Sequence, residues 1–157
     1  MLAIQDGIQR LIEQERVIVV GSVDKKGIPN VSPRSAIFWN NEAIFWLEFF
    51  DHKSRQNFKD NEWVSVAVFN TEKQEGFQLK GKVRFLTNYQ KREMVYKITQ
   101  STPKALAKIY DEKIKNENIE VIQFEPRAIY SLDPRQEAGL LALVKNDETL
   151  SKIEEEN

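Results

Sequence analysis

Three consecutive polar residues, His52, Lys53 and Ser54, lie between two apolar segments, residues 43–50 and 63–69. Both apolar segments have the composition of β-strands, so the polar residues are expected to begin a short helix between two strands. An imidazole, an ammonium group, a hydroxyl and the free N–H groups of a helix start suit a phosphate dianion, because a helix N-terminus attracts negative charge. His52 is also the only histidine of the chain. We therefore predict that this segment binds the phosphate of a cofactor.

The same residues have a simpler interpretation that needs no ligand. An exposed helix start capped by the side chain of Asp51 or Ser54 is a common arrangement in proteins. The local pattern leaves both interpretations open, and further segments of the chain are needed to choose between them.

Composition and charge exclude several classes of function. The chain has 157 residues, of which 41% are hydrophobic and 30% are charged, and its net charge is −1. This balance gives no electrostatic reason to expect nucleic acid or membrane binding. The absence of cysteine excludes disulfides, thiolate metal sites and thiol catalysis, and a single histidine excludes a histidine-rich metal site. We predict no metal.

Hydropathy and length predict a cytoplasmic protein with one folded domain. No apolar run approaches the roughly 20 residues that span a bilayer. Residues 1–6 have neither the basic region nor the apolar core of a signal peptide. We expect a single domain over residues 1–150, followed by an acidic tail at 151–157.

The elements that must position the polar segment are mainly strands. Helical periodicity is expected in four segments: residues 4–15, 53–60, 89–100 and 104–115. Extended structure is expected in six segments: residues 17–20, 31–39, 43–50, 63–69, 76–85 and 121–130, the last interrupted at Pro126. The segment around residues 140–144 is expected to be helical or irregular.

About six strands with short turns and few helices indicate a mainly β fold, a β-barrel with peripheral helices, rather than alternating βαβ units. A Rossmann domain would need a glycine-rich turn between a strand and a helix. The six glycines are spread too thinly along the chain to form one.

Three segments taken together resemble the FMN-binding split-barrel family related to pyridoxamine 5′-phosphate oxidase. Residues 27–38 resemble the strand that lies along the flavin, residues 52–57 the phosphate-binding turn and helix start, and residues 76–81 the long strand opposite. Their order and spacing cover roughly residues 10–90. The resemblance implies a split β-barrel of the FMN-binding type.

The resemblance also implies how the strands would hold FMN. Arg34 would reach the phosphate or the ribityl chain, and the backbone of Ser35 and Ala36 would run beside the isoalloxazine ring. Trp46 and Leu47 match the adjacent strand that lines the flavin site. These roles come from the family pattern and not from the spacing of the residues.

The phosphate end follows in the same way. His52, Lys53 and Ser54 would bind the phosphate, and Asn57 would brace the helix start. Gln78 would point its amide toward the ring or the ribityl hydroxyls. In the family the flavin lies at a homodimer interface to which both subunits contribute, so the resemblance implies a homodimer.

Several of these residues also have ordinary structural interpretations. Arg34 could form a surface or interface ion pair. Gln78 could belong with Lys80 and Lys82 to the solvated face of a strand. Tryptophans such as Trp46 are more often core or interface residues than flavin contacts.

The segment after Ser131 departs from the vitamin-forming oxidase of the family. That enzyme binds pyridoxal phosphate with arginine, histidine and tryptophan residues of its C-terminal extension. Residues 132–140 contain no histidine or tryptophan, and Arg135 alone cannot replace that site. We therefore do not expect vitamin B6 oxidation.

The sequence supports three hypotheses for function. The first is an FMN-dependent oxidoreductase acting on an unidentified small molecule, with the redox chemistry supplied by the flavin. The second is a non-catalytic FMN-binding electron carrier. The third keeps the fold and replaces FMN with a deazaflavin or haem. No catalytic residue is singled out by the sequence.

Overall fold

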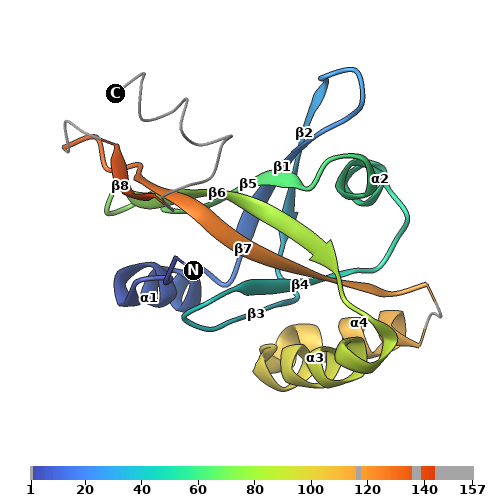
Figure 1. The fold of residues 1–157 in the computed structure, drawn as a ribbon. Coiled ribbons are helices and arrows are strands. Elements are labelled where there is room, and N and C mark those ends of the chain that lie inside the picture. Colours follow the sequence, from blue (N-terminus) through green and yellow to red (C-terminus); the bar gives the residue numbers. More distant parts are fainter. Residues whose placement is uncertain (1, 116–117, 136–138, 144–157) are drawn as a thin grey trace.

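The computed structural model describes residues 2–115, 118–135 and 139–143, in which strands predominate (Figure 1). The helices are α1 (Asp6–Glu15), α2 (Lys53–Asp60), α3 (Asn88–Ser101) and α4 (Lys104–Ile114). The strands are β1 (Ile18–Val23), β2 (Pro29–Arg34), β3 (Ile37–Trp39), β4 (Ile44–Glu48), β5 (Trp63–Asn70), β6 (Glu75–Phe85), β7 (Glu120–Ser131) and β8 (Leu140–Leu143). The acidic tail expected at 151–157 lies outside the described residues.

All strands form one antiparallel sheet that curls into a partly open barrel. The order along the sheet is β2-β1-β5-β6-β7-β4-β3, and β8 pairs with β7. Strands β2 and β3 form opposite edges, yet only Ser35 and Ala36 connect them. A connection of two residues forces the two edges together, so the sheet must close on itself at this point without pairing. The mainly β fold expected from the sequence is confirmed, and we call this junction of the two edges the seam.

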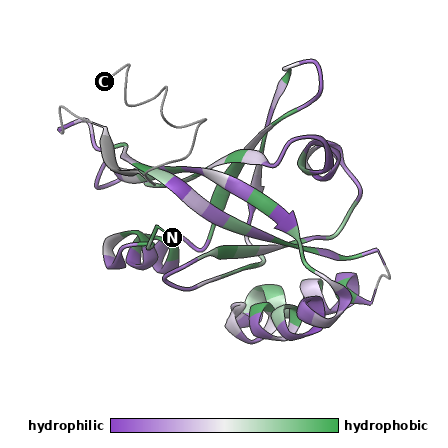
Figure 2. Ribbon diagram, viewed as in Figure 1, coloured by the Kyte–Doolittle hydropathy of each residue, from purple (hydrophilic) through white to green (hydrophobic). Residues whose placement is uncertain are grey.

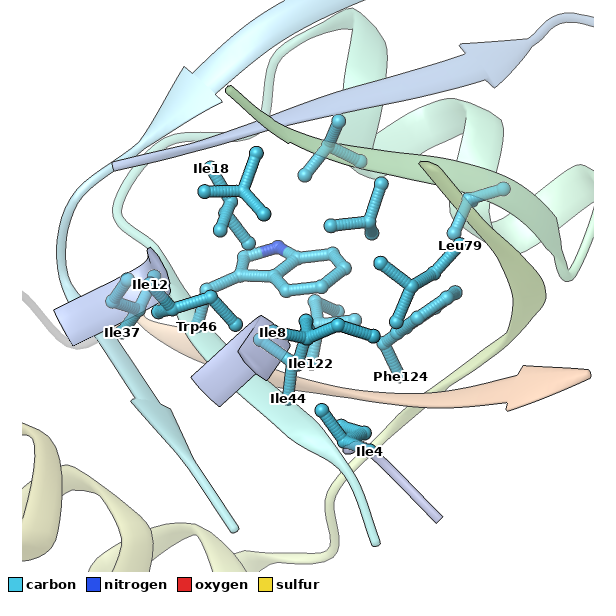
Figure 3. Packing of buried hydrophobic residues seen from close by; sticks show 14 of the residues in the cluster. Ile4, Ile8, Ile12, Ile18, Ile37, Ile44, Trp46, Leu79, Ile122 and Phe124 are labelled. Atoms are coloured by element: carbon cyan, nitrogen blue, oxygen red, sulfur yellow. The ribbon is translucent and has the colours of Figure 1, made fainter. Parts of the chain in front are cut away.

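The inside of the curled sheet is filled by the main hydrophobic core. Trp46 lies at its centre and packs against Phe58 of α2 and Phe124 of β7, with ring centroids 5.9 Å and 6.4 Å away (Figure 3). Helix α1 packs against β5 and β6 and buries Ile8 and Ile12 in the same core. The helix therefore uses its apolar face to fill the interior, as its periodicity predicts.

A second core lies between the other face of β4 and the pair of helices α3 and α4. Phe45 and Leu47 of β4 pack there with Met94, Ile98 and Tyr110. Strand β4 is therefore buried on both faces, which explains why its sequence is apolar at consecutive positions. Figure 2 shows the contrast with helix α2, which is hydrophilic along most of its length.

Three sequence expectations are corrected by the structure. The stretch 31–39 forms two strands, β2 and β3, separated by the seam. The C-terminal segment forms strand β8 rather than a helical or irregular segment. Strand β7 continues through Pro126, because its pairing with β4 ends at Phe124 and its pairing with β8 begins at Ala128. The missing N–H of Pro126 therefore costs no ladder hydrogen bond on that side.

Gly81 allows β6 and β7 to approach closely at the same place. The register of this pair shifts between Lys80 and Gly81. A Cβ atom on Gly81 would overlap the carbonyl oxygen of Glu125. The glycine therefore permits the irregularity opposite Pro126. Among the described residues, no helix is long and apolar enough to cross a membrane.

Candidate functional site

A cavity of about 520 Å³ opens at the seam, beyond the end of β4. Four elements meet there: the end of β2, the segment that follows β4, the start of α2, and α4. The cavity is lined by Asn30, Ser32, Pro33, Arg34, Ser35, Ala36, Leu47, Glu48, Phe49, Phe50, His52, Lys53, Ser54, Tyr110 and Lys113. Its size lies within the range of small-molecule sites, and its walls combine apolar surface with a few polar groups.

The first turn of α2 borders this cavity without a side-chain cap. His52 is the N-cap residue, with extended backbone angles, and makes no side-chain cap hydrogen bond. Ser54 instead turns toward β2, where its hydroxyl accepts a hydrogen bond from the amide of Asn30 and pairs with the hydroxyl of Ser32, both at 2.9 Å. Asp51 accepts a hydrogen bond from the side chain of Gln56. Capping by Asp51 or Ser54 is therefore not how this helix start is built, and its N–H groups remain able to bind an anion.

Arg34 and Glu48 form an ion pair in the cavity wall. The guanidinium Nε lies 2.8 Å from Oε1 of Glu48, whose side chain is only 5% exposed. The same oxygen accepts a hydrogen bond of 2.8 Å from the indole Nε1 of Trp46. Nη1 of Arg34 also donates to the hydroxyl of Ser32 and the carbonyl of Pro33. The pair neutralises the charge of Arg34, so the ordinary interpretation of Arg34 as half of an ion pair holds, with Glu48 buried and Arg34 partly buried.

Helix α4 supplies another part of the cavity wall through Tyr110 and Lys113. The hydroxyl of Tyr110 is hydrogen-bonded to the hydroxyl of Ser35, and its ring stacks on Phe49 with centroids 5.6 Å apart. One turn later, Nζ of Lys113 lies 5.3 Å from the ring centroid of Phe49 and 5.4 Å from that of Phe50. These contacts hold an aromatic hydroxyl and an ammonium group in the cavity.

Seven of the residues predicted from the sequence line this single cavity: Arg34, Ser35, Ala36, Leu47, His52, Lys53 and Ser54. The fold therefore brings together segments that are separated in the sequence. The roles of these residues toward a cofactor stay predictions.

Three other predicted residues lie elsewhere. Trp46 points into the main core and is 0% exposed. Asn57 is buried on the far side of α2, where its amide donates to the hydroxyl of Ser22. Gln78 alternates with the buried Leu79 and so lies on the outer face of β6.

The sequence interpretation missed the contributions of Glu48, Tyr110 and Lys113. Glu48 ends an apolar run. Because a buried carboxylate needs a charged or hydrogen-bonding partner, its position predicts that another polar side chain lies beside it. Tyr110 and Lys113 follow helical spacing on α4 and read as an ordinary helix face. Only the packing of α4 beside the seam brings them to the cavity.

Arg135 does not take part in the cavity. Its guanidinium makes two hydrogen bonds to the carboxylate of Asp133, at 2.8 Å and 2.9 Å. These hydrogen bonds lower the pKa of Asp133. Within the described part of the chain, no cluster of three or more acidic, histidine or cysteine side chains could hold a metal ion.

Comparison with known proteins places these features in a family. A family model described as "Pyridoxamine 5'-phosphate oxidase" matches residues 4–133. No curated protein sequence matches the chain.

Solved structures with low sequence identity share the fold. A Clostridium acetobutylicum protein of the pyridoxinephosphate oxidase family, related to general stress protein 26 of B. subtilis, is 15% identical, covers 82% of this chain and 87% of its own, and has a TM-score of 0.66. HutZ, the haem storage protein of Vibrio cholerae, is 16% identical, covers 80% of this chain and 92% of its own, and has a TM-score of 0.65. An F420 reductase is 16% identical, covers 80% of this chain and 98% of its own, and has a TM-score of 0.59. At these identities the likeness concerns the fold alone.

Proposed function

Because this chain belongs to the pyridoxamine 5′-phosphate oxidase family, we propose that it is an FMN-binding oxidoreductase acting on a small molecule. The observation that supports the proposal is the cavity at the seam, which joins an uncapped helix start to an apolar wall. A phosphate monoester carries about two negative charges near neutral pH. Helix N–H groups and Lys53 suit that phosphate, while Ala36, Leu47 and Phe49 suit a flat ring.

In this proposal the flavin supplies the redox chemistry, and the chain supplies binding, orientation and exclusion of water. Lys53 and the first turn of α2 bind the phosphate. Ser54 is held by Asn30 and Ser32, which fixes the helix start against β2. Vitamin B6 oxidation is not proposed, because Arg135 is engaged with Asp133 and lies away from the cavity lining. The cytoplasmic location expected from the sequence stays a prediction.

Replacing Lys53 with alanine should weaken FMN binding by roughly tenfold, because a charge-assisted hydrogen bond to phosphate contributes about 1.5 kcal/mol or more. The fold should remain intact, since Lys53 is exposed. Fluorescence titration with FMN measures the change. Lys59→Ala is the matched control, because Lys59 is exposed in the last turn of the same helix, where the helix dipole does not favour anions. Unchanged FMN affinity in Lys53→Ala would remove Lys53 from the site.

We also propose a homodimer that forms through the outer face of the sheet. Val19, Val31 and Phe69 all point outward from neighbouring strands, and Val31 is 70% exposed. Large exposed apolar side chains gathered on one face of a sheet favour an interaction site there. Gln78 lies on the outer face as well, so it would contact a flavin only through such an association.

Light scattering on the purified protein should therefore give twice the 18.4 kDa mass of the chain. Val31→Glu should shift the protein toward the monomer, because a charge would be buried at the interface. A wild-type protein that is monomeric and still binds FMN tightly would contradict the proposed dimer but not the proposed FMN site.

Haem is the second candidate ligand, because the only histidine of the chain, His52, lines the cavity. The absorption spectrum of the purified protein distinguishes the two: flavin bands, with FMN released on denaturation, support the first proposal, and a Soret band supports haem. Turnover with NADPH and a panel of substrates then separates an enzyme from an electron carrier. A colourless protein without affinity for FMN would exclude both flavin proposals.

A further inference from the structure

Lys113 is a cation in the cavity that the interpretation of the sequence did not assign to the site. It belongs to α4. The rings of Phe49 and Phe50 hold its ammonium group by cation–π contacts at 5.3 Å and 5.4 Å. Among the described residues, no carboxylate lies within salt-bridge distance of Lys113. The aromatic rings position this charge but do not neutralise it.

The contacts of α4 connect Lys113, through one aromatic ring, to the residue that precedes α2. Tyr110, one turn earlier on α4, is hydrogen-bonded to Ser35 at the seam. Lys113 contacts Phe50, and the ring of Phe50 also lies 5.3 Å from the imidazole of His52. The ring of Phe50 therefore lies next to both Lys113 of α4 and His52, the residue that precedes α2.

The charged side chains that line the cavity carry a net positive charge. Arg34 and Glu48 neutralise each other. Lys53 and Lys113 both line the cavity, and neither forms an ion pair within the part of the chain that the structure describes. Two uncompensated ammonium groups favour a ligand group with two negative charges over a group with one or none.

We propose that Lys113 is the second cation of the phosphate subsite, and that Lys53 and Lys113 together select a phosphate monoester. This inference rests on the proposed function, because it concerns the same cavity. It adds a specificity: a flavin with a terminal phosphate dianion binds better than a flavin phosphodiester, which carries one charge, and better than riboflavin, which carries none. Arg34 is excluded from this role by its pairing with Glu48.

Titration of purified protein with three flavins tests the proposal: FMN, riboflavin 4′,5′-cyclic phosphate and riboflavin. Quenching of flavin fluorescence reports binding without any turnover. We expect Lys113→Met to weaken FMN by about tenfold, the cyclic phosphate by less, and riboflavin not at all. Lys113→Arg should retain most of the FMN affinity, because it keeps the charge. Lys108→Met is the matched control on the exposed face of the same helix and should behave as the wild type.

Other outcomes overturn the proposal in recognisable ways. An equal loss for all three flavins would show that Lys113 supports the wall of the cavity rather than the phosphate. No loss for any flavin would show that Lys113 does not contact the ligand. Circular dichroism and the unfolding midpoint establish that Lys113→Met is folded. If the wild-type protein binds none of the three flavins, the proposed function fails. If the wild-type protein binds FMN tightly and the Lys113→Met variant binds it equally well, only the role of Lys113 fails.

Discussion

Replacing Glu48 with alanine should lower the free energy of unfolding by about 3–5 kcal/mol, because removal of one partner leaves a buried charge without compensation. Arg34 would lose its carboxylate, and Trp46 would lose the acceptor of its indole N–H. Urea denaturation followed by circular dichroism measures the loss. Because Arg34 remains 15% exposed at the cavity wall, the lower end of this range is expected.

The conservative variant Glu48→Gln separates charge from hydrogen bonding. Its amide oxygen can still accept from Arg34 and Trp46, so the stability loss should be smaller, about 1.5–3 kcal/mol. The freed charge of Arg34 should at the same time strengthen binding of FMN relative to riboflavin. Stability and phosphate preference are therefore expected to change in opposite directions. Unaltered stability in both variants would mean that the ion pair contributes nothing to the fold.

Replacing Trp46 with alanine should cost about 3–5 kcal/mol, the loss typical of a large aromatic residue removed from a core. The indole is 0% exposed and packs against Phe58 and Phe124 (Figure 3). Thermal or urea unfolding measures the effect. Trp39→Ala is the matched control, because that indole is only partly buried and should cost less. The effects of the Trp46 and Glu48 variants should not add, since the two residues share a hydrogen bond.

Trp46→Phe tests whether Trp46 contacts a flavin, as the family resemblance implies. It keeps most of the core volume and loses the N–H donor. Its position in the main core predicts reduced stability with FMN affinity close to that of the wild type. A large loss of FMN affinity with unchanged stability would instead support a direct contact between Trp46 and the flavin.

The helix start that binds the proposed phosphate could be predicted from the sequence because its signal is local. Three polar residues follow a buried strand, and the helix begins at Lys53 as expected. The alternation of β6 is equally local: Leu79 and Val83 are buried, and Lys82 is not. Patterns of this kind fix elements because side-chain direction follows directly from the backbone period.

The rest of the cavity depends on contacts that no local pattern records. Tyr110 meets Ser35 across 75 positions of the chain, so helical periodicity alone could not place it at the seam. The proline at 126 suggested a broken strand, because the sequence does not show that β4 ends just before it and β8 begins just after it. The family resemblance assigns both Trp46 and Leu47 to the flavin site. Because neighbouring residues of a strand point to opposite faces, only Leu47 reaches the cavity, and Trp46 lies in the main core.

The most direct test of a phosphate-binding flavin site is the ratio of the FMN and riboflavin dissociation constants for the wild-type protein. The two ligands share the ring and the ribityl chain, so the ratio isolates the phosphate. Two ammonium groups and the start of α2 predict saturable binding in which FMN is at least roughly tenfold tighter than riboflavin. Equal dissociation constants for the two ligands, or no binding of FMN, would contradict the assignment of the α2 start as a phosphate site.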